Sequence, residues 1–224
     1  MNSKIYKTSE LYRTNASLAY DFVLEHEYPW EALAEISEKI MCLGVTLPGD
    51  KFDIWDKNIW IAKNANVAKS ASITGPCIID EGAEIRHCAY IRGGVIAGKN
   101  VVVGNSTELK NCILFDGVQV PHYNYVGDSI LGYKSHMGAG SITSNVKSDR
   151  SFVAIKSGSV NIQTGLKKCG AFLGDFVEIG CGAVLNPGTI IGNNSIVYPL
   201  SSVRGVVGER SIYKRSGEVI EKSD

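Results

Sequence analysis

Net charge is the first thing that this sequence lacks, because 23 Lys and Arg residues balance 23 Asp and Glu residues in a chain of 224. A nucleic-acid surface needs clustered excess positive charge, so the balance argues against nucleic-acid partners. The sequence has no apolar run near the ~20 residues of a membrane span, and its beginning, MNSKIYKTSELYRTN, shows no signal peptide. We therefore expect a cytoplasmic protein without a membrane span.

Cysteine and proline are also scarce, with 6 of each. No two cysteines lie closer than eleven residues, so the chain has no CxxC pair of a zinc knuckle or a thioredoxin-like site. Without a secretion signal, the cysteines are expected to be buried free thiols. No spacing of His, Asp and Glu resembles a metal triad, and no phosphate loop of the Walker or Rossmann type occurs. We expect no metal site.

Apolar residues are present in a repeat of six. The first run is Ile61, Val67, Ile73, Ile79, Ile85, Ile91, Ala97, Val103 and Leu109, and the second is Leu173, Ile179, Leu185, Ile191, Val197 and Val203. Between the two runs the repeat continues through Leu114, Val120, Val126, Leu131, Met137 and Ile142, with three steps shortened to five. Glycine often follows the aliphatic residue, as tight turns favour.

A period of six fits neither a helix nor a hairpin and is typical of a hexapeptide-repeat parallel β-helix. In such an all-β solenoid three hexads make one triangular coil, the aliphatic residues point inward, and stacked strands lie ~4.8 Å apart. The two strict runs argue against a coincidence in a β-sandwich. We assign the β-helix to residues 59–207, with an inserted loop at about 143–172.

The first 58 residues lack this repeat and show helical spacing. One apolar stripe comprises Leu18, Ala19, Phe22 and Val23, and a second comprises Trp30, Leu33, Ile36, Ile40 and Leu43. Because a solenoid needs its open ends covered, we expect residues 1–58 to form a helical cap on the first coil. Residues 208–224 are expected to be a C-terminal tail or a short final strand.

Two cations are predicted to stack on the outside of the solenoid. Arg92 and Lys110 each follow an inward residue and are 18 positions apart, so they occupy equivalent places on successive coils, ~4.8 Å apart. In one interpretation, the two side chains are solvated and point away from each other. The other is a phosphate clamp, in which Arg92 supplies a bidentate fork and Lys110 a point charge.

His122 is the candidate general base. It lies two residues after the inward Val120, on the coil that follows Lys110, and is expected near the same edge. A lone histidine is usually structural or merely exposed, but histidine is the side chain best suited to accept a proton near neutral pH. The remaining histidines, at positions 26, 87 and 136, have weaker surroundings and are interpreted as structural.

Three motifs carry a resemblance to a known family: VGNSTELK at Val103–Lys110, HYNYVGD at His122–Asp128 and GAGSITSN at Gly138–Asn145. In this order they resemble the acetyltransferase half of the bifunctional bacterial enzyme that joins N-acetylglucosamine-1-phosphate uridyltransferase to glucosamine-1-phosphate acetyltransferase. The whole layout, with EYPW at Glu27–Trp30, also resembles a stand-alone group labelled UDP-N-acetylglucosamine pyrophosphorylase-related. The resemblance implies a left-handed coil, a homotrimer, and acetyl-CoA sites between neighbouring chains.

The resemblance also implies residue roles. His122 matches the general base, and Arg92 and Lys110 match the cations that hold the sugar phosphate. The other matches are Tyr125 and Asn145 as sugar contacts, Lys168 as a further substrate lysine, and Ala139 and Cys181 as positions beside acetyl-CoA.

The sequence departs from the family pattern at several places. His136 replaces an Asn, which changes one sugar contact, and Cys181 replaces a Ser. The long insertion at 146–167 is in a position to reshape or cover the cofactor groove. The glycine-rich nucleotide-binding half has no counterpart in these residues, so none of them supports uridyltransferase activity.

These observations predict an acetyl-CoA-dependent N-acetyltransferase that acts on an amino-sugar phosphate or a nucleotide-linked amino sugar. Direct transfer needs neither a metal nor a covalent enzyme intermediate. Two other functions stay open: a non-catalytic sugar-phosphate-binding trimer, and a subunit that partners a separate sugar-phosphate nucleotidyltransferase.

Overall fold

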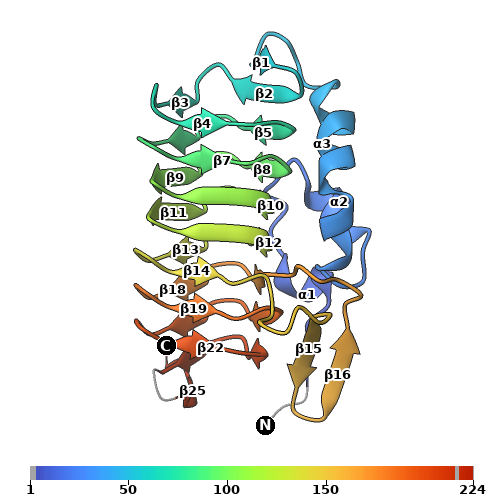
Figure 1. The fold of residues 1–224 in the computed structure, drawn as a ribbon, viewed down its shortest axis with the longest axis vertical. Helices are drawn as coiled ribbons and strands as arrows, with labels where there is room; N and C mark the ends of the chain where they lie inside the picture. The colour runs from blue at the N-terminus through green and yellow to red at the C-terminus, as the bar shows by residue number, and fades with distance from the viewer. Residues whose placement is uncertain (1–3, 215–216, 224) are drawn as a thin grey trace.

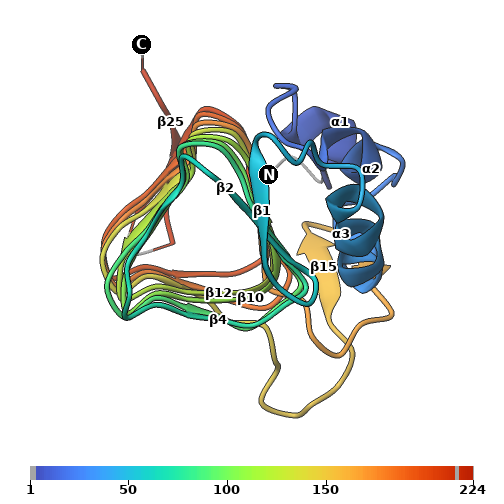
Figure 2. The same cartoon turned by 90° about the horizontal axis from the view of Figure 1, so that it is seen from above.

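The computed structural model describes residues 4–214 and 217–223. The chain winds into a stack of short parallel strands with a triangular outline (Figures 1 and 2). The predicted β-solenoid is therefore confirmed, whereas the left hand of the coil stays a prediction.

Three faces make up the solenoid, and each carries one strand from successive coils. Face 1 consists of β3 (Asn66–Val67), β6 (Glu84–Ile85), β9 (Val102–Asn105), β11 (Gln119–His122), β13 (His136–Met137), β18 (Glu178–Ile179), β21 (Ile196–Val197) and β24 (Ser211–Tyr213). Face 2 consists of β4 (Ser72–Ile73), β7 (Tyr90–Ile91), the first parts of β10 (Glu108–Leu114) and β12 (Tyr125–Leu131), β14 (Ile142–Thr143), β19 (Val184–Leu185) and β22 (Ser202–Val203).

Face 3 consists of β2 (Ile59–Ala62), β5 (Cys77–Ile79), β8 (Val95–Ala97), the second parts of β10 and β12, β17 (Ala171–Leu173), β20 (Thr189–Ile191) and β23 (Val206–Val207). Antiparallel strands lie at both ends of the stack. β1 (Phe52–Asp56) pairs with β2, and β25 (Val219–Glu221) pairs with β24. The solenoid thus extends past residue 207, the predicted boundary, to Tyr213.

The sixth-residue repeat identifies the interior with one error. From Ile79 to Met137, and from Leu173 to Val203, its residues are at most 2% exposed. Ile142, however, is only partly buried, and its neighbour Thr143 is the inward residue, paired in register with Val126 and Leu185. The step from Met137 is therefore six rather than five. Thr143 is accepted inside because the backbone N–H of Gly127 donates to its Oγ1 at 2.9 Å.

The outside of face 3 is apolar, unlike faces 1 and 2. One outward position per coil forms a ladder in register, made of Trp60, Ile78, Ile96, Ile113, Ile130, Phe172, Ile190 and Val206. All of these but Val206 are buried. Such a ladder needs a cover, because exposed apolar area costs roughly 25 cal/mol per Å².

The N-terminal segment provides this cover along the side of the solenoid, so the expected cap on the first coil is wrong. Its helices are α1 (Thr8–Leu11), α2 (Tyr20–Leu24), the 3-10 helix η1 (Glu31–Ala34) and α3 (Ile36–Gly44). They climb from the last coils to the first (Figure 1), and α3 packs against β5, β8 and β10. The second apolar stripe is broken into η1 and α3 rather than forming one helix.

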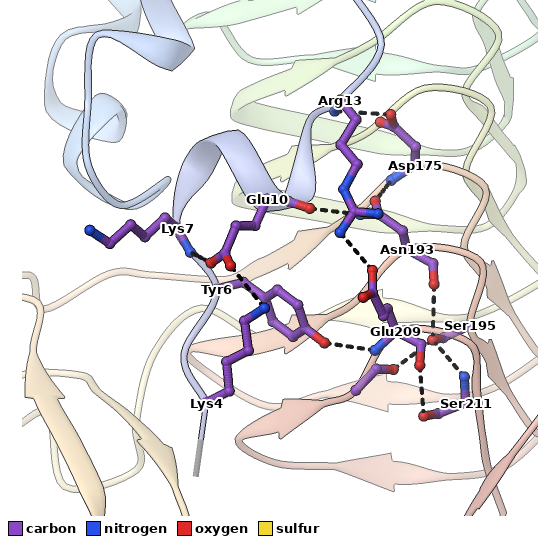
Figure 3. Close-up of polar contacts among 11 residues, drawn as sticks. Lys4, Tyr6, Lys7, Glu10, Arg13, Asp175, Asn193, Ser195, Glu209 and Ser211 are labelled. Atoms are coloured by element: carbon purple, nitrogen blue, oxygen red, sulfur yellow. Dashed lines mark hydrogen bonds and ion pairs between the residues drawn. The ribbon is translucent and has the colours of Figure 1, made fainter. Parts of the chain in front are cut away.

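Polar contacts fasten the start of this segment to the last coils (Figure 3). The backbone N–H of Glu209 donates to the Tyr6 hydroxyl at 2.8 Å, and Asn193 Nδ2 donates to the Glu10 carbonyl at 2.7 Å. The Asp175 carboxylate accepts from the backbone N–H groups of Arg13 and Thr14. These bonds explain why the segment lies beside the coils instead of over their end.

The insertion after Asn145 forms a hairpin of β15 (Ala154–Ser157) and β16 (Val160–Gln163). Val153 and Ile155 are buried, and their side chains pack over Gly188 below the helices of face 3. Within one chain the hairpin therefore lies on face 3, away from the corner that carries His122.

All six cysteines are free thiols, as expected, but only three are buried. Burial raises the pKa of the Cys77 thiol to about 12, so this group stays protonated at neutral pH. Cys42, Cys88 and Cys181 are exposed, so the expectation of buried thiols is wrong for them. No helix in the described part of the chain is long and apolar enough to cross a membrane.

Candidate functional site

Three of the predicted site residues stack at the corner between faces 1 and 2. The N–H of Gly140 donates to the His122 carbonyl at 3.0 Å, and the N–H of Gly182 donates to the Ala139 carbonyl at 2.8 Å. His122, Ala139 and Cys181 thus occupy one equivalent position on three successive coils. His122 and Cys181 are exposed, so this corner presents an imidazole and a thiol with a small residue between them.

A buried amide fixes the turn that carries His122. Asn124 is 3% exposed, and its Oδ1 accepts from the backbone N–H of His122 at 3.1 Å. Its Nδ2 donates to the carbonyl of Gly138 at 2.9 Å and to that of Ser141 at 3.1 Å. One side chain therefore ties the His122 turn to the next turn of the stack, which contains Ala139.

Arg92 and Lys110 occupy equivalent outward positions on face 2, since β7 and β10 pair Ile91 with Leu109. Each cation already has a carboxylate partner within the chain. Arg92 Nη1 lies 2.7 Å from Glu108 Oε1, and Lys110 Nζ lies 3.0 Å from Asp128 Oδ1. The mutual repulsion of the stacked cations is thus relieved by protein carboxylates, and both cations keep donors to spare for an external anion.

Asp128 is the centre of a hydrogen-bond network at the corner between faces 2 and 3. Its carboxylate is buried and accepts from Lys110 Nζ, from Asn111 Nδ2 at 3.0 Å, and from Asn145 Nδ2 at 2.5 Å. Asp128 has a φ of 49°, which aspartate tolerates better than most residues. Asn111 Nδ2 also donates to the Leu33 carbonyl at 3.1 Å, which links the N-terminal segment to the network.

Tyr125 lies on face 2 within the same network. Asn145 Nδ2 donates to the Tyr125 hydroxyl at 3.1 Å. The ring lies over Gly127, where an added Cβ would come within 2.4 Å of the hydroxyl oxygen. Burial, followed by the negative charge of Asp128, raises the pKa of the Tyr125 phenol, so the hydroxyl is protonated at neutral pH.

Lys168 approaches this network through its neighbour in sequence. The N–H of Cys169 donates to the Asn145 carbonyl at 2.9 Å, which places exposed Lys168 next to the strand end that carries Asn145. The other histidines have local partners: Ser70 for His87, Glu178 for His136, and the Phe22 carbonyl for His26. Among the described residues, no three His, Cys, Asp or Glu side chains gather as metal ligands would.

The repeat predicts the two cations but not their partners Glu108, Asp128 and Asn111. Asp128 and Asn111 belong to the network, whereas Glu108 pairs with Arg92. Glu108 and Asp128 stand inside the three motifs. Glu108 is two residues before Lys110, so both point outward from one strand, and this spacing was a usable signal. The contact between Asn111 and Leu33 spans 78 residues and gives no signal of this kind.

Stacked coils, an exposed histidine at a corner and paired cations on the neighbouring face define a hexapeptide-repeat β-helix protein. The family model of the GMPPB C-terminal domain matches residues 73–196, and the chain belongs to this family.

Two curated relatives carry bifunctional names. The chain is 34% identical over 223 residues to the bifunctional protein GlmU of Methanococcus vannielii, covering 86% of this chain and 54% of that protein. It is 31% identical over 192 residues to the bifunctional sugar-1-phosphate nucleotidylyltransferase/acetyltransferase of Sulfurisphaera tokodaii, covering 74% of this chain and 48% of that protein. The chain thus spans about half the length of the curated relatives it matches. The resemblance drawn from the three motifs is confirmed.

One solved structure aligns with much of the chain. The acetyltransferase domain of PglB from Neisseria gonorrhoeae, in complex with acetyl coenzyme A, aligns with a TM-score of 0.33 at 15% identity. The alignment covers 81% of this chain and 61% of that one.

Proposed function

We propose that this protein is an N-acetyltransferase that moves an acetyl group from acetyl-CoA to an amino-sugar phosphate or a nucleotide-linked amino sugar. The observation that carries the proposal is the adjacency of the His122 corner and face 2. His122 lies at the corner between faces 1 and 2, and Arg92 and Lys110 lie on the two preceding coils, at the other end of face 2. The bifunctional names of the relatives from M. vannielii and S. tokodaii support the same activity.

In this proposal the amine nitrogen of the sugar attacks the thioester carbonyl carbon, and His122 takes the N–H proton. The C–S bond then breaks, and CoA leaves as its thiol with the proton that His122 returns to the sulfur. The backbone N–H of Ala139 donates to no described residue and is available to stabilise the oxyanion. Arg92 and Lys110 hold the phosphate, with Lys168 approaching from the inserted segment, while Tyr125 and Asn145 contact the sugar.

The corner has room for the co-substrate. Ala139 has a small side chain between two glycines, and Cys181 is exposed one coil further along. We place acetyl-CoA along this column, and a second copy of the chain on its other side, in a homotrimer. The free thiols fit a reducing compartment such as the cytoplasm.

The experiment measures release of CoA from acetyl-CoA with a panel of amino-sugar phosphates. We expect His122→Ala to lower turnover by about 10²–10⁴-fold with little change in substrate affinity. His87→Ala is the matched control, because His87 stands in the same corner column two coils earlier; its turnover should match the wild type.

Three results would count against the proposal. A His122→Ala variant with full activity rules out this histidine as the base. A wild type that binds sugar phosphates but never consumes acetyl-CoA favours the non-catalytic trimer, and co-purification of a nucleotidyltransferase chain favours the partner subunit.

A further inference from the structure

A small pocket lies where α3 meets the corner between faces 2 and 3. Its volume is about 270 Å³, and its lining includes Arg92, Lys110, Gly93, Gly94 and Ser37. Four of these five belong to the solenoid, whereas Ser37 comes from the N-terminal segment. The pocket therefore brings the paired cations of the proposed phosphate site against a helix that lies more than fifty residues earlier in the sequence.

Ser37 offers an unused hydroxyl to this pocket. Ser37 is half-buried, and its Oγ has no hydrogen-bond partner among the described residues. The hydroxyl lies over Gly94, because a Cβ added at Gly94 would be 3.4 Å from Ser37 Oγ. Gly94 has a φ of 65° and leaves the backbone bare beneath the hydroxyl. The Ser37 hydroxyl is thus a free donor that borders the space beside the two cations.

The position of Ser37 is fixed by its surroundings. Ile36 and Ile40 of α3 are fully buried, and α3 packs on the strands of face 3. One turn earlier, the Leu33 carbonyl accepts from Asn111 Nδ2 at 3.1 Å, and the same nitrogen donates to Asp128. The apolar contacts and this hydrogen bond hold the start of α3 against the strand that carries Lys110.

The chemistry of the lining favours an anion. The pocket is lined by two cations, one hydroxyl and one amide, and no carboxylate belongs to its lining. Ser37 is the second residue of a nine-residue helix, so the positive end of the helix dipole faces the same space. The volume lies below the roughly 300–1,000 Å³ of a site that encloses a whole ligand, so the pocket suits a single charged group.

We propose that Ser37 is a substrate-binding residue and that α3 is the far wall of the phosphate site. Ser37 donates to a phosphate oxygen, while Arg92 and Lys110 bind the others. This inference rests on the proposed sugar-phosphate function and adds Ser37 to its phosphate site.

The test is calorimetric binding of glucosamine 1-phosphate to the full chain. A hydrogen bond to a charged group is worth about tenfold or more in affinity, so we expect Ser37→Ala to weaken binding by about tenfold. Ser37→Thr keeps the hydroxyl and should bind within about threefold of the wild type. Ser72→Ala is the matched control, since Ser72 is an exposed serine of face 2 outside the pocket. Glucosamine, which has no phosphate, should bind the wild type and Ser37→Ala alike.

Two results overturn the inference: equal affinity of Ser37→Ala and the wild type for glucosamine 1-phosphate, or a loss of affinity in Ser37→Ala that is as large for glucosamine as for glucosamine 1-phosphate. The outcome is separable from that of the proposed function. If binding depends on Ser37 but no acetyl transfer occurs, the acetyltransferase activity is refuted and the phosphate-binding role of Ser37 is supported. Acetyl transfer with an unchanged KM in Ser37→Ala supports the acetyltransferase and refutes the binding role of Ser37.

Discussion

Two ion pairs lie one coil apart on face 2 and differ in burial. The side chains of Lys110 and Asp128 are 26% and 5% exposed, whereas those of Arg92 and Glu108 are 44% and 32% exposed. Salt screens a buried ion pair less than an exposed ion pair. We therefore predict that a double-mutant cycle on Lys110 and Asp128 gives a large coupling energy that salt does not remove.

The magnitude follows from the partners of Asp128. Asp128→Asn replaces one carboxylate oxygen by an NH₂ group. At the Oδ1 position this group would face the donors Lys110 and Asn111, and at the Oδ2 position it would face Asn145. A buried donor left without an acceptor costs about 1–3 kcal/mol. Asparagine tolerates the positive φ of Asp128, so this substitution removes the charge and one acceptor without straining the backbone.

The single variant Lys110→Met leaves the Asp128 carboxylate with amide donors alone. Loss of one partner from a fully buried pair costs about 3–5 kcal/mol, and the partial exposure of Lys110 reduces this figure. Because the double variant removes both charges at once, we expect a coupling energy of about 1–3 kcal/mol. Each kcal/mol lost should lower Tm by about 2–4 °C in a chain of this size.

The assay is urea unfolding at one fixed protein concentration, since self-association makes stability depend on concentration. The cycle of Arg92→Met and Glu108→Gln is the control, measured with and without 1 M NaCl. Its coupling should be smaller and should vanish in salt, as exposed pairs do. Equal couplings in the two cycles, or a Lys110–Asp128 coupling that salt abolishes, would refute the assignment of Asp128 as a buried anchor.

Three further predictions concern assembly and stability. Light scattering after size exclusion should give a particle of three 24.2 kDa chains, and a monomer at every micromolar concentration would contradict the trimer. Burial raises the pKa of Asp80, whose Oδ2 has no partner among the described residues. Folding therefore favours the protonated acid, and stability is lost as pH rises from about 4 through the raised pKa. Asp80→Asn should then raise Tm at pH 7 but not near pH 3, and an equal effect at both would contradict this. Thr143→Val should cost about 1–3 kcal/mol by leaving the Gly127 N–H unpaired, whereas Thr143→Ser should cost less; equal loss in urea unfolding would assign the cost to packing.

The interior and the stacking of the coils were predictable because they depend on residues at a fixed short spacing. A repeat of six predicts which side chains point inward, and it places Arg92 and Lys110 at equivalent positions. The repeat failed at Thr143, where an inward hydroxyl is satisfied by a backbone N–H of the coil before. A repeat restricted to aliphatic residues selects Ile142 instead, because it does not allow for an inward hydroxyl that a backbone N–H satisfies.

The path of the N-terminal segment was mispredicted because one pattern was overlooked. Each coil has a second apolar residue directly before the inward residue of face 3, as in Ile78–Ile79, Ile96–Ala97 and Ile130–Leu131. In a strand, adjacent residues point to opposite sides, so these pairs predict a face that is apolar outside as well as inside. On faces 1 and 2 the residue before the inward one is polar or aromatic on most coils, with Val102, Ile142, Val184 and Ile196 among the exceptions. The unbroken apolar series on face 3 therefore indicates which face needs a cover.

In the candidate site, too, positions set by the short repeat were predictable, and contacts between residues far apart in the sequence were not. His122, Ala139 and Cys181 share a corner because they stand at one position of the repeat. The contact of Asn111 with Leu33 depends instead on where the cover lies. The apolar ladder holds α3 on face 3, and Asn111 joins the preceding helix η1 to Asp128 through the Leu33 carbonyl. The helical segment therefore cannot shift without disturbing Lys110. The N-terminal segment is therefore a structural part of the site, and its position is set by the apolar residues of face 3 rather than by the open end of the solenoid.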